Sequence, residues 1–265
     1  GKLTLNEEQE VEIAVSAYEA SLNLQIWKNY VDEIGVSVIH PGGTAIGPLQ
    51  RIQGTQRFQL GETNLLVYYG EPSPYNPYQE IYLDFIPVGS YIDDGIWKIR
   101  LTPIRITDGA FDMWLPAGNV LNSGTGFLNP VEETTLTIPS TATKVITVGA
   151  YDARFDQAAA FSGRGYTRAT NQVKPDLVAP GVEIMSCAPG GGYQVRTGTS
   201  MATPFVTGSA ALLMQWGIVN GNDAYLYGEK MKAYLIRGAR RLPGFTAYPN
   251  PILGWGALCT ANSIP

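Results

Sequence analysis

The residues best suited to chemistry lie in the stretch 196–204, which reads Arg-Thr-Gly-Thr-Ser-Met-Ala-Thr-Pro. It places Ser200 directly before the segment 205–214, which is apolar almost all round. We expect that segment to be a core helix, with Pro204 in its first turn, where a missing N–H costs nothing. Ser200 then lies at the helix N-terminus, where free N–H groups and the helix dipole stabilise negative charge. This arrangement suits acyl transfer with Ser200 as the nucleophile.

Two donors beside Ser200 could stabilise the oxyanion of such a reaction. The first is the backbone N–H of Ser200 itself, and the second is the hydroxyl of Thr199. An ordinary N-cap is the alternative role for a serine before a helix, because Ser, Thr and Asp are common at that position.

Composition narrows the function classes. A chain of 265 residues holds one large or two medium domains with ample core. The net charge of −5, without any cluster of Lys and Arg, argues against nucleic acid as a partner. We find no signal peptide and no apolar run of membrane-spanning length. The two cysteines, Cys187 and Cys259, cannot make a disulfide framework. We expect Cys187 to be a buried thiol, with a single bridge between the two as the alternative.

The elements that must position Ser200 follow two patterns along the chain. Up to about residue 129, short segments alternate apolar and polar side chains and are separated by turns rich in Gly and Pro. This pattern predicts an all-β sandwich or jelly-roll domain over residues 1–129. The predicted strands are 11–15, 22–27, 35–40, 57–60, 64–69, 80–86, 95–101 and 109–115.

The second half has a different character. The continuous apolar run 145–150 is typical of a buried strand in a parallel sheet. A strand framed by Pro and Gly follows within 174–184, and helical spacing predicts a helix over 228–237. Strands that alternate with helices indicate an α/β domain over residues 130–265.

Five motifs in this half occur in the order found in subtilisin-like serine proteases, the subtilases. They are Ile-Thr-Val-Gly-Ala (146–150), Phe-Ser-Gly-Arg-Gly (161–165), Lys-Pro-Asp-Leu-Val-Ala-Pro-Gly-Val (174–182), Gly-Thr-Ser-Met-Ala-Thr-Pro (198–204) and Leu-Gly-Trp-Gly (253–256). The resemblance implies that residues 130–265 are the C-terminal part of a subtilase catalytic domain. It also implies peptidase S8-type hydrolysis of a protein or peptide substrate, with Ser200 as the nucleophile.

Three further stretches resemble the clostridial Csp-type subtilases more narrowly. These are 111–116, 165–168 and 215–222. That subgroup carries an inserted jelly-roll domain and processes germination enzymes in spores. The resemblance therefore implies a bacterial protein that is extracytoplasmic or associated with spores.

The other members of a subtilase triad are not recognisable. The single histidine, His40, ends a predicted strand in the β region, so we expect it to be a surface residue and not the catalytic base. Asn119 resembles the family's oxyanion asparagine superficially, and we expect it to be a turn residue. We expect the aspartates in the best-matching contexts to be turn or loop residues: Asp32, Asp84, Asp152 and Asp176.

We therefore expect this chain to be a C-terminal fragment of a longer protease and to be inactive alone. Its missing N-terminal part would carry the triad Asp and His and the oxyanion Asn. An incomplete parallel sheet exposes an apolar edge, so we expect the chain to bind that missing part or a second copy of itself. The alternative is a pseudoprotease that uses the subtilase scaffold as a binding or regulatory module.

Cofactors and the role of the β domain are less determined by the sequence. The sequence shows no metal-binding cluster. Calcium binding stays an open alternative, because the calcium ligands in such proteins are scattered along loops. We expect the β domain to rigidify the protein, and carbohydrate binding is the alternative role. We expect Trp27, Trp97 and Trp114 to pack in the core. The loop tyrosines are the better candidates for contact with a ligand: Tyr75, Tyr78 and Tyr91.

Overall fold

The computed structural model describes residues 1–117 and 120–264, so the predicted turn residue Asn119 lies outside the described residues. The chain forms two compact units. We refer to Gly1–Pro130 as the sandwich unit and to Val131–Pro265 as the α/β unit, and describe each by itself.

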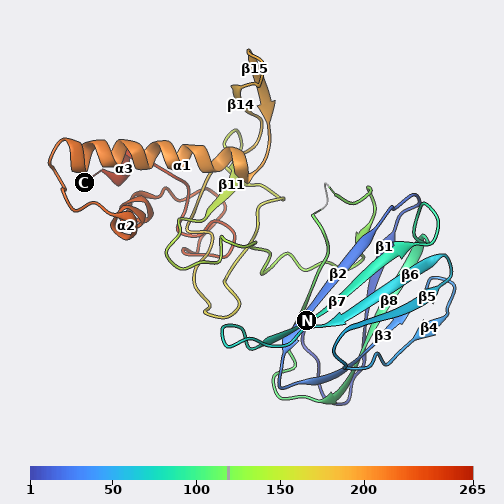
Figure 1. Cartoon of the computed structure of the whole chain (residues 1–265). Helices are drawn as coiled ribbons and strands as arrows, with labels where there is room; N and C mark the ends of the chain where they lie inside the picture. Colours follow the sequence, from blue (N-terminus) through green and yellow to red (C-terminus); the bar gives the residue numbers. More distant parts are fainter. Residues whose placement is uncertain (118–119, 265) are drawn as a thin grey trace. The chain divides into compact units, whose positions relative to one another are not determined.

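The sandwich unit consists of two five-stranded sheets that share one core (Figure 1). One sheet has the strand order β10-β1-β8-β3-β4 and the other β5-β6-β7-β2-β9, and all neighbours are antiparallel. The strands are β1 (Gln9–Val15), β2 (Leu22–Asn29), β3 (Glu33–Ile39), β4 (Ala45–Ile46), β5 (Thr55–Leu60), β6 (Thr63–Tyr69), β7 (Tyr78–Pro87), β8 (Gly95–Arg105), β9 (Phe111–Trp114) and β10 (Gly126–Phe127).

Alternation of apolar and polar residues explains why these segments form a sandwich. In β2, Leu22, Leu24 and Ile26 are fully buried, while the residues between them are half-buried on the outer face. Trp97 of β8 lies at the centre of the core, and its ring meets Phe85 edge-to-face with centroids 5.1 Å apart. The core prediction is confirmed for Trp97. It is wrong for Trp27 and Trp114, which are half-buried because strand alternation turns them outward.

All eight predicted strands are present. The sequence pattern missed β4 and β10, because two residues are too few to show an alternation. Asp84 lies within β7, so its prediction as a turn residue is wrong. Asp152 is the last residue of a strand in the other unit and was also misassigned to a loop. Asp32 does lie in the turn between β2 and β3, but it is fully buried and accepts backbone N–H groups from Thr107, Asp108 and Gly109.

The α/β unit is built around a small sheet with the order β12-β11-β13. β11 (Val148–Asp152) and β13 (Leu177–Pro180) are parallel, as the apolar run predicts, whereas β12 (Gln157–Ala158) is antiparallel to β11. Both parallel strands are shorter than the predicted ranges. A separate hairpin consists of β14 (Ile184–Cys187) and β15 (Tyr193–Arg196). The helices are α1 (Thr199–Met214), which continues into the π-helical turn η1 (Gln215–Val219), α2 (Gly228–Gly238) and α3 (Thr260–Ser263).

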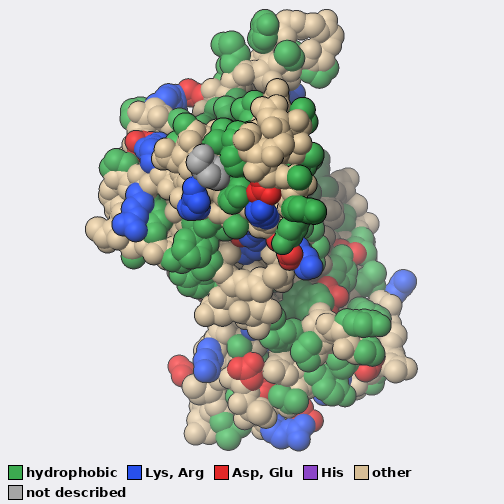
Figure 2. Space-filling view, turned by 90° about the vertical axis from the view of Figure 1, so that its left-hand side faces the viewer, with side chains coloured by type: hydrophobic (Ala, Val, Ile, Leu, Met, Phe, Trp, Pro, Cys, Tyr) green, Lys and Arg blue, Asp and Glu red, His purple; other side chains and the backbone are tan. Residues whose placement is uncertain are grey.

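The hairpin extends away from the sheet and exposes apolar side chains. Met185 is opposite Val195, and Cys187 is opposite Tyr193, so these four residues share one face. Figure 2 shows hydrophobic side chains on this hairpin at the top of the view. The prediction of a buried Cys187 thiol is wrong, because an isolated two-stranded hairpin has no second layer to cover it. Cys187 and Cys259 are both free, so they form no bridge.

Helix α1 is buried on one side only. Ala202, Val206 and Leu213 pack on the core, whereas Leu212 is 54% and Val219 76% exposed. The prediction of a helix at the centre of a domain is therefore confirmed for one face only. The continuous helix Thr199–Val219 is also long and apolar enough to cross a membrane by length and composition alone, which corrects our expectation from the sequence. Core helices of soluble proteins meet the same criterion.

Candidate active site

The position of Ser200 is set by the glycine before the helix. Gly198 is the N-cap of α1 and has a φ of 154° and a ψ of 164°, a conformation that side chains with a Cβ rarely adopt. Its N–H donates to Gly181 O at 2.8 Å, and its carbonyl accepts the Met201 N–H at 3.0 Å. These bonds attach the start of α1 to the loop that follows β13. Ser200 is consequently the second residue of the helix and not its N-cap.

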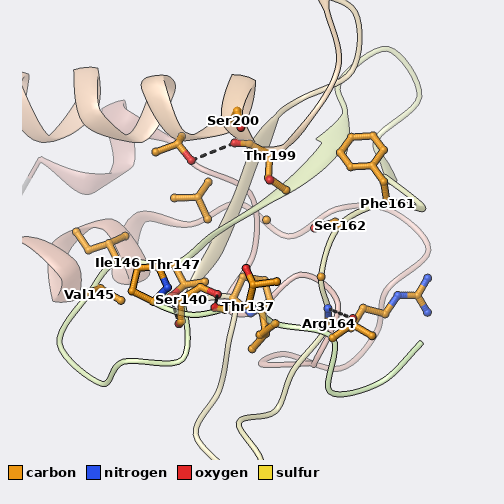
Figure 3. Close-up of a pocket in the computed structure, with 18 of the residues that line it drawn as sticks. Thr137, Ser140, Val145, Ile146, Thr147, Phe161, Ser162, Arg164, Thr199 and Ser200 are labelled. Atoms are coloured by element: carbon orange, nitrogen blue, oxygen red, sulfur yellow. Dashed lines mark hydrogen bonds between the residues drawn. The ribbon is translucent and has the colours of Figure 1, made fainter. Parts of the chain in front are cut away.

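Ser200 is exposed at the first turn of α1, beside Thr199 (Figure 3). Within the described part of the chain, no hydrogen bond occupies the Ser200 hydroxyl or its backbone N–H. The hydroxyl of Thr203 donates to Thr199 O at 3.0 Å and so satisfies one carbonyl of the opening turn. The first turn therefore presents a free hydroxyl and a free N–H on the same residue, at the positive end of the helix dipole.

Pro204 is the sixth residue of α1, so its prediction as a first-turn residue is wrong. A proline at this position cannot donate to Ser200 O, four residues earlier. The helix begins at Thr199, because Gly198 provides the break in backbone conformation.

Thr199, Ser200 and Thr203 line a cavity of about 640 Å³ in the α/β unit. Figure 3 shows Phe161, Ser162 and Arg164 on one side of it and Ile146, Thr147 and Ser140 on another. A volume of this size is in the range of ligand-binding pockets, about 300–1,000 Å³. The Ser200 hydroxyl is thus accessible on the wall of a cavity large enough for a peptide segment.

The wall opposite α1 is fixed by the Phe-Ser-Gly-Arg-Gly motif. The Ser162 hydroxyl accepts the Ala150 N–H at 3.0 Å and holds this turn against β11. Gly165 donates its N–H to Pro251 O, and a Cβ at Gly165 would lie 2.0 Å from Lys174 O. Only glycine fits such a close backbone approach. The motif therefore has a packing role that explains its residue types.

A buried ion network adjoins the cavity through Thr147, which also lines it. Lys174 Nζ donates to Asp176 Oδ2 at 2.8 Å and to Thr147 Oγ1 at 2.9 Å, and the Thr147 N–H donates to the same carboxylate oxygen at 2.7 Å. Lys232 of α2 lies 2.7 Å from Asp176 Oδ1. Burial lowers the pKa of Lys174, and Asp176 opposes that effect. Asp176 lies in a loop as predicted, where it joins α2 and the segment before β11 to the start of β13.

No histidine lies near Ser200 in the α/β unit, because the only histidine of the sequence is His40 of the sandwich unit. His40 directly follows β3, as expected. Its Nδ1 accepts the Gly42 N–H at 2.8 Å, and its Nε2 lies 3.1 Å from Asp93 Oδ2. His40, Thr63 and Glu62 hold the pKa of Asp93 below its usual range against the effect of burial. His40 therefore has local partners that account for its position in the sandwich.

The remaining predicted groups do not converge on Ser200. Asp152 pairs with Arg154, which holds the pKa of Asp152 below its usual value. Asp84 lies in the sandwich unit, where burial raises its pKa. No group of three or more His, Cys, Asp or Glu residues that could hold a metal ion occurs among residues 1–117 and 120–264. This part of the chain thus presents a free serine hydroxyl and a free N–H beside a cavity.

A serine with a free hydroxyl and a free N–H in the first turn of a helix, beside a cavity, suits acyl transfer. Comparison with known sequences defines the class, because the profile of the Subtilase family matches residues 115–256. The chain belongs to the subtilase family of subtilisin-like serine proteases.

Among its relatives, the serine protease AprX of Bacillus subtilis is 34% identical over 169 residues, covering 56% of this chain and 36% of AprX. An intracellular serine protease of Paenibacillus polymyxa is 46% identical over 77 residues, covering 29% of this chain and 21% of that protein. The solved structure of the CspB protease of Clostridium perfringens aligns with a TM-score of 0.89 and 38% identity. That alignment covers 99% of this chain and 54% of CspB. The chain therefore spans about half the length of CspB and about a third of AprX.

Proposed function

We propose that this chain provides the nucleophile side of a subtilisin-type endopeptidase site, with Ser200 as the nucleophile. One observation carries the proposal: Ser200 presents a free hydroxyl and a free N–H on a cavity of about 640 Å³, within the region that matches the family. In this reaction Ser200 Oγ attacks the peptide carbonyl carbon. The Ser200 N–H then holds the oxyanion, and the Thr199 hydroxyl supports it.

The proton of Ser200 Oγ needs a base, and later the leaving amine needs a proton. His40 is engaged with Gly42 and Asp93 in the sandwich unit, so we assign neither transfer to it. We propose that a histidine and an aspartate outside this sequence supply both transfers, together with an oxyanion asparagine. On this proposal, residues 1–265 are the C-terminal part of a longer protease and are close to inactive alone.

The open edge of the small sheet supports the same proposal. Within the described residues, the second edge of β11 pairs with β12 at Tyr151 and Asp152, and Ala150 bonds there to Ser162 Oγ and to the Ala159 N–H, so only the part before Ala150 is open. The preceding residues Ile146–Gly149 instead line the cavity beside Ser200. A further strand could hydrogen-bond along this free edge. We propose that the partner is the upstream part of the same protease and that a second copy of the chain is its substitute.

We propose that the sandwich unit is an inserted domain of jelly-roll type. The pairing of β1 with β8 and of β2 with β7 nests the strands as in a jelly roll, although β4, β5 and β6 follow their own order. The CspB alignment, which covers 99% of this chain, supports an insertion that accompanies the catalytic unit. We propose that this domain rigidifies the protein. If it does, deleting the sandwich unit lowers the thermal stability of the remaining protein.

The test uses a fluorophosphonate probe, which labels an activated serine. In the longest natural form of the protein, we expect labelling of Ser200 that Ser200→Ala abolishes. Thr207→Ala, an exposed position two turns along α1 that does not line the cavity, is the matched control and keeps labelling. Residues 1–265 alone should react at least about a thousandfold more slowly, because the base is absent.

Two results would overturn the proposal. Efficient Ser200-dependent labelling or peptide cleavage by residues 1–265 alone would show that the base lies within this chain. A longest natural form that is folded but never labelled would favour the alternative, a pseudoprotease that uses the subtilase scaffold for binding. The observation that favours this alternative is that no side chain of the described residues is placed to activate Ser200.

A further inference from the structure

A second cavity lies in the sandwich unit, away from every residue assigned to peptide hydrolysis. Its volume is about 580 Å³, and it is lined by the β2–β3 turn, the β4–β5 loop, the end of β6 and the end of β8. Strand ends and loops on a rigid sandwich are common places for binding sites. Its lining is mostly polar and includes Tyr30, Glu33, Arg51, Tyr69, Glu71 and Arg105.

Arg51 is held in place but has no counter-charge. Its guanidinium lies over the Tyr30 ring, 4.8 Å from the ring centroid. The ring attracts the cation, and no hydrogen bond joins the guanidinium N–H groups to an acceptor within the described residues. No ion pair joins Arg51 to a carboxylate within the described residues, whereas Arg105 at the same cavity lies 3.5 Å from Glu33. Arg51 is therefore a positioned and uncompensated cation.

Tyr69 supplies an independent second observation. Its side chain is 95% buried, since only 5% is exposed, and it lines the cavity. Its hydroxyl has no hydrogen-bond partner within residues 1–117 and 120–264. The residue is buried, but its hydroxyl oxygen stays accessible from the cavity, so a ligand there can hydrogen-bond to it.

Buried hydrogen bonds fix two of the segments that line the cavity. The buried Lys28 donates to Asp32 O at 2.6 Å and to Asn29 O at 3.3 Å, which fixes the β2–β3 turn. The Asp32 carboxylate in turn accepts three consecutive backbone N–H groups, from Thr107 to Gly109, and fixes the segment that follows β8. A site whose loops are already ordered loses less conformational entropy when a ligand binds.

The charges select the ligand. One free cation matches one negative group, and the planar edge of a guanidinium fits a carboxylate in bidentate geometry. The acceptors Glu33 and Glu71 disfavour a second negative charge and favour donors such as hydroxyl groups. We propose that this cavity binds a small sugar acid, whose carboxylate contacts Arg51 and the Tyr69 hydroxyl and whose hydroxyl groups donate to the rim carboxylates.

The experiment measures binding to the whole chain by calorimetry and by ligand-observed NMR, with glucuronate as the probe. Glucose tests the need for the carboxylate, acetate tests the need for the hydroxyl groups, and inorganic phosphate tests for a general anion site. We expect glucuronate to bind at least about tenfold more tightly than each of the three, since charge-assisted hydrogen bonds are worth that much.

Two variants link binding to the named groups. Arg51→Gln should weaken glucuronate binding by about tenfold or more, and Tyr69→Phe by about threefold to tenfold. Tyr69→Phe removes only an unpaired hydroxyl, so its thermal unfolding should match that of the parent chain and exclude misfolding as the cause. Arg57→Gln is the matched control, because Arg57 is an exposed arginine on β5 that does not line the cavity.

Four outcomes would overturn the proposal. The first is equal binding of glucuronate and glucose, and the second is equal or tighter binding of acetate or phosphate. The third is no glucuronate binding by the folded chain, and the fourth is binding that both Arg51→Gln and Tyr69→Phe leave unchanged. None of these measurements depends on Ser200, so this proposal stands or fails separately from peptide hydrolysis.

Discussion

Asp176 is the residue on which the buried network of the α/β unit depends. Its carboxylate faces both Lys174 and Lys232 and also accepts the Thr147 N–H. Asp176→Asn leaves Lys174, which is 1% exposed, without a counter-charge. We expect the free energy of unfolding of this unit to fall by about 3–5 kcal/mol, because an unpaired buried charge is costly. Urea denaturation measures the loss.

The matched comparisons separate charge from shape. The triple variant Lys174→Met, Asp176→Leu, Lys232→Met removes all three charges and should cost less than Asp176→Asn alone. Asp156→Asn breaks the exposed pair with Arg240 and should have little effect. If Asp176→Asn proved as mild as Asp156→Asn, the network would not hold this unit together.

Lys28 makes the stability of the sandwich unit depend on pH. Burial, with a smaller contribution from Arg51, lowers the pKa of Lys28 to about 8, although Asp32 and Glu33 oppose the shift. Between that value and the ordinary lysine pKa near 10.5, the unfolded chain binds a proton that the folded chain lacks. The free energy of unfolding should therefore rise with pH above 8, by up to about 1.4 kcal/mol per pH unit.

Urea denaturation between pH 8 and 9.5 tests this slope, below the range in which tyrosines ionise. Lys28→Gln should remove the rise. Lys98→Gln should keep it, because Glu12 and Glu10 raise the pKa of Lys98 and keep it charged in this window. A rise that persists in Lys28→Gln would assign it to another group.

Helix α1 offers a comparison within one element. Leu213 is fully buried in the core of the α/β unit, and its neighbour Leu212 is 54% exposed. Leu213→Ala should lower the free energy of unfolding by about 2–5 kcal/mol through lost burial and a cavity. Leu212→Ala should change it by less than about 1 kcal/mol. Equal effects in thermal or urea unfolding would contradict the one-sided burial of this helix.

The elements also show how far the sequence could predict the structure. Alternation located every long strand of the sandwich, because burial on one face imposes a period of two. The nucleophile motif located Ser200, since its glycine and helix specify a local geometry. The sequence pattern could not show that α1 is covered on one side only, because an apolar helix looks the same whether or not a neighbour covers it.

The same limit applies to positions that depend on distant segments. Cys187 was expected to be buried because its strand is apolar, but the hairpin has no second layer. The cavity that contains Arg51 and Tyr69 is formed by segments up to 77 residues apart, from Tyr30 to Thr107. Local composition does not show which loops meet, so neither residue could be selected from its neighbours in the sequence.

The molecule as a whole exposes many apolar side chains and carries few charged residues. Phe205, Leu212 and Val219 are exposed along α1 and η1, and Met185, Tyr193 and Val195 are exposed on the hairpin. The edge of β11 before Ala150 has no pairing strand among the described residues. Only 15% of the residues are charged, and the net charge is −5. Contiguous apolar surface and open strand edges favour association.

We therefore expect residues 1–265 to self-associate as concentration rises. Analytical ultracentrifugation should detect species larger than the 28.7 kDa monomer. Leu212→Glu and Val219→Glu should each shift the distribution towards monomer, because a carboxylate on this face opposes burial of the helix in an interface. Ile104→Glu, at a position 61% exposed in the sandwich unit, is the matched control and should leave association unchanged. A folded monomer at every concentration would instead mean that α1 and the β11 edge need no partner, and it would remove the support that this surface gives to a missing upstream part.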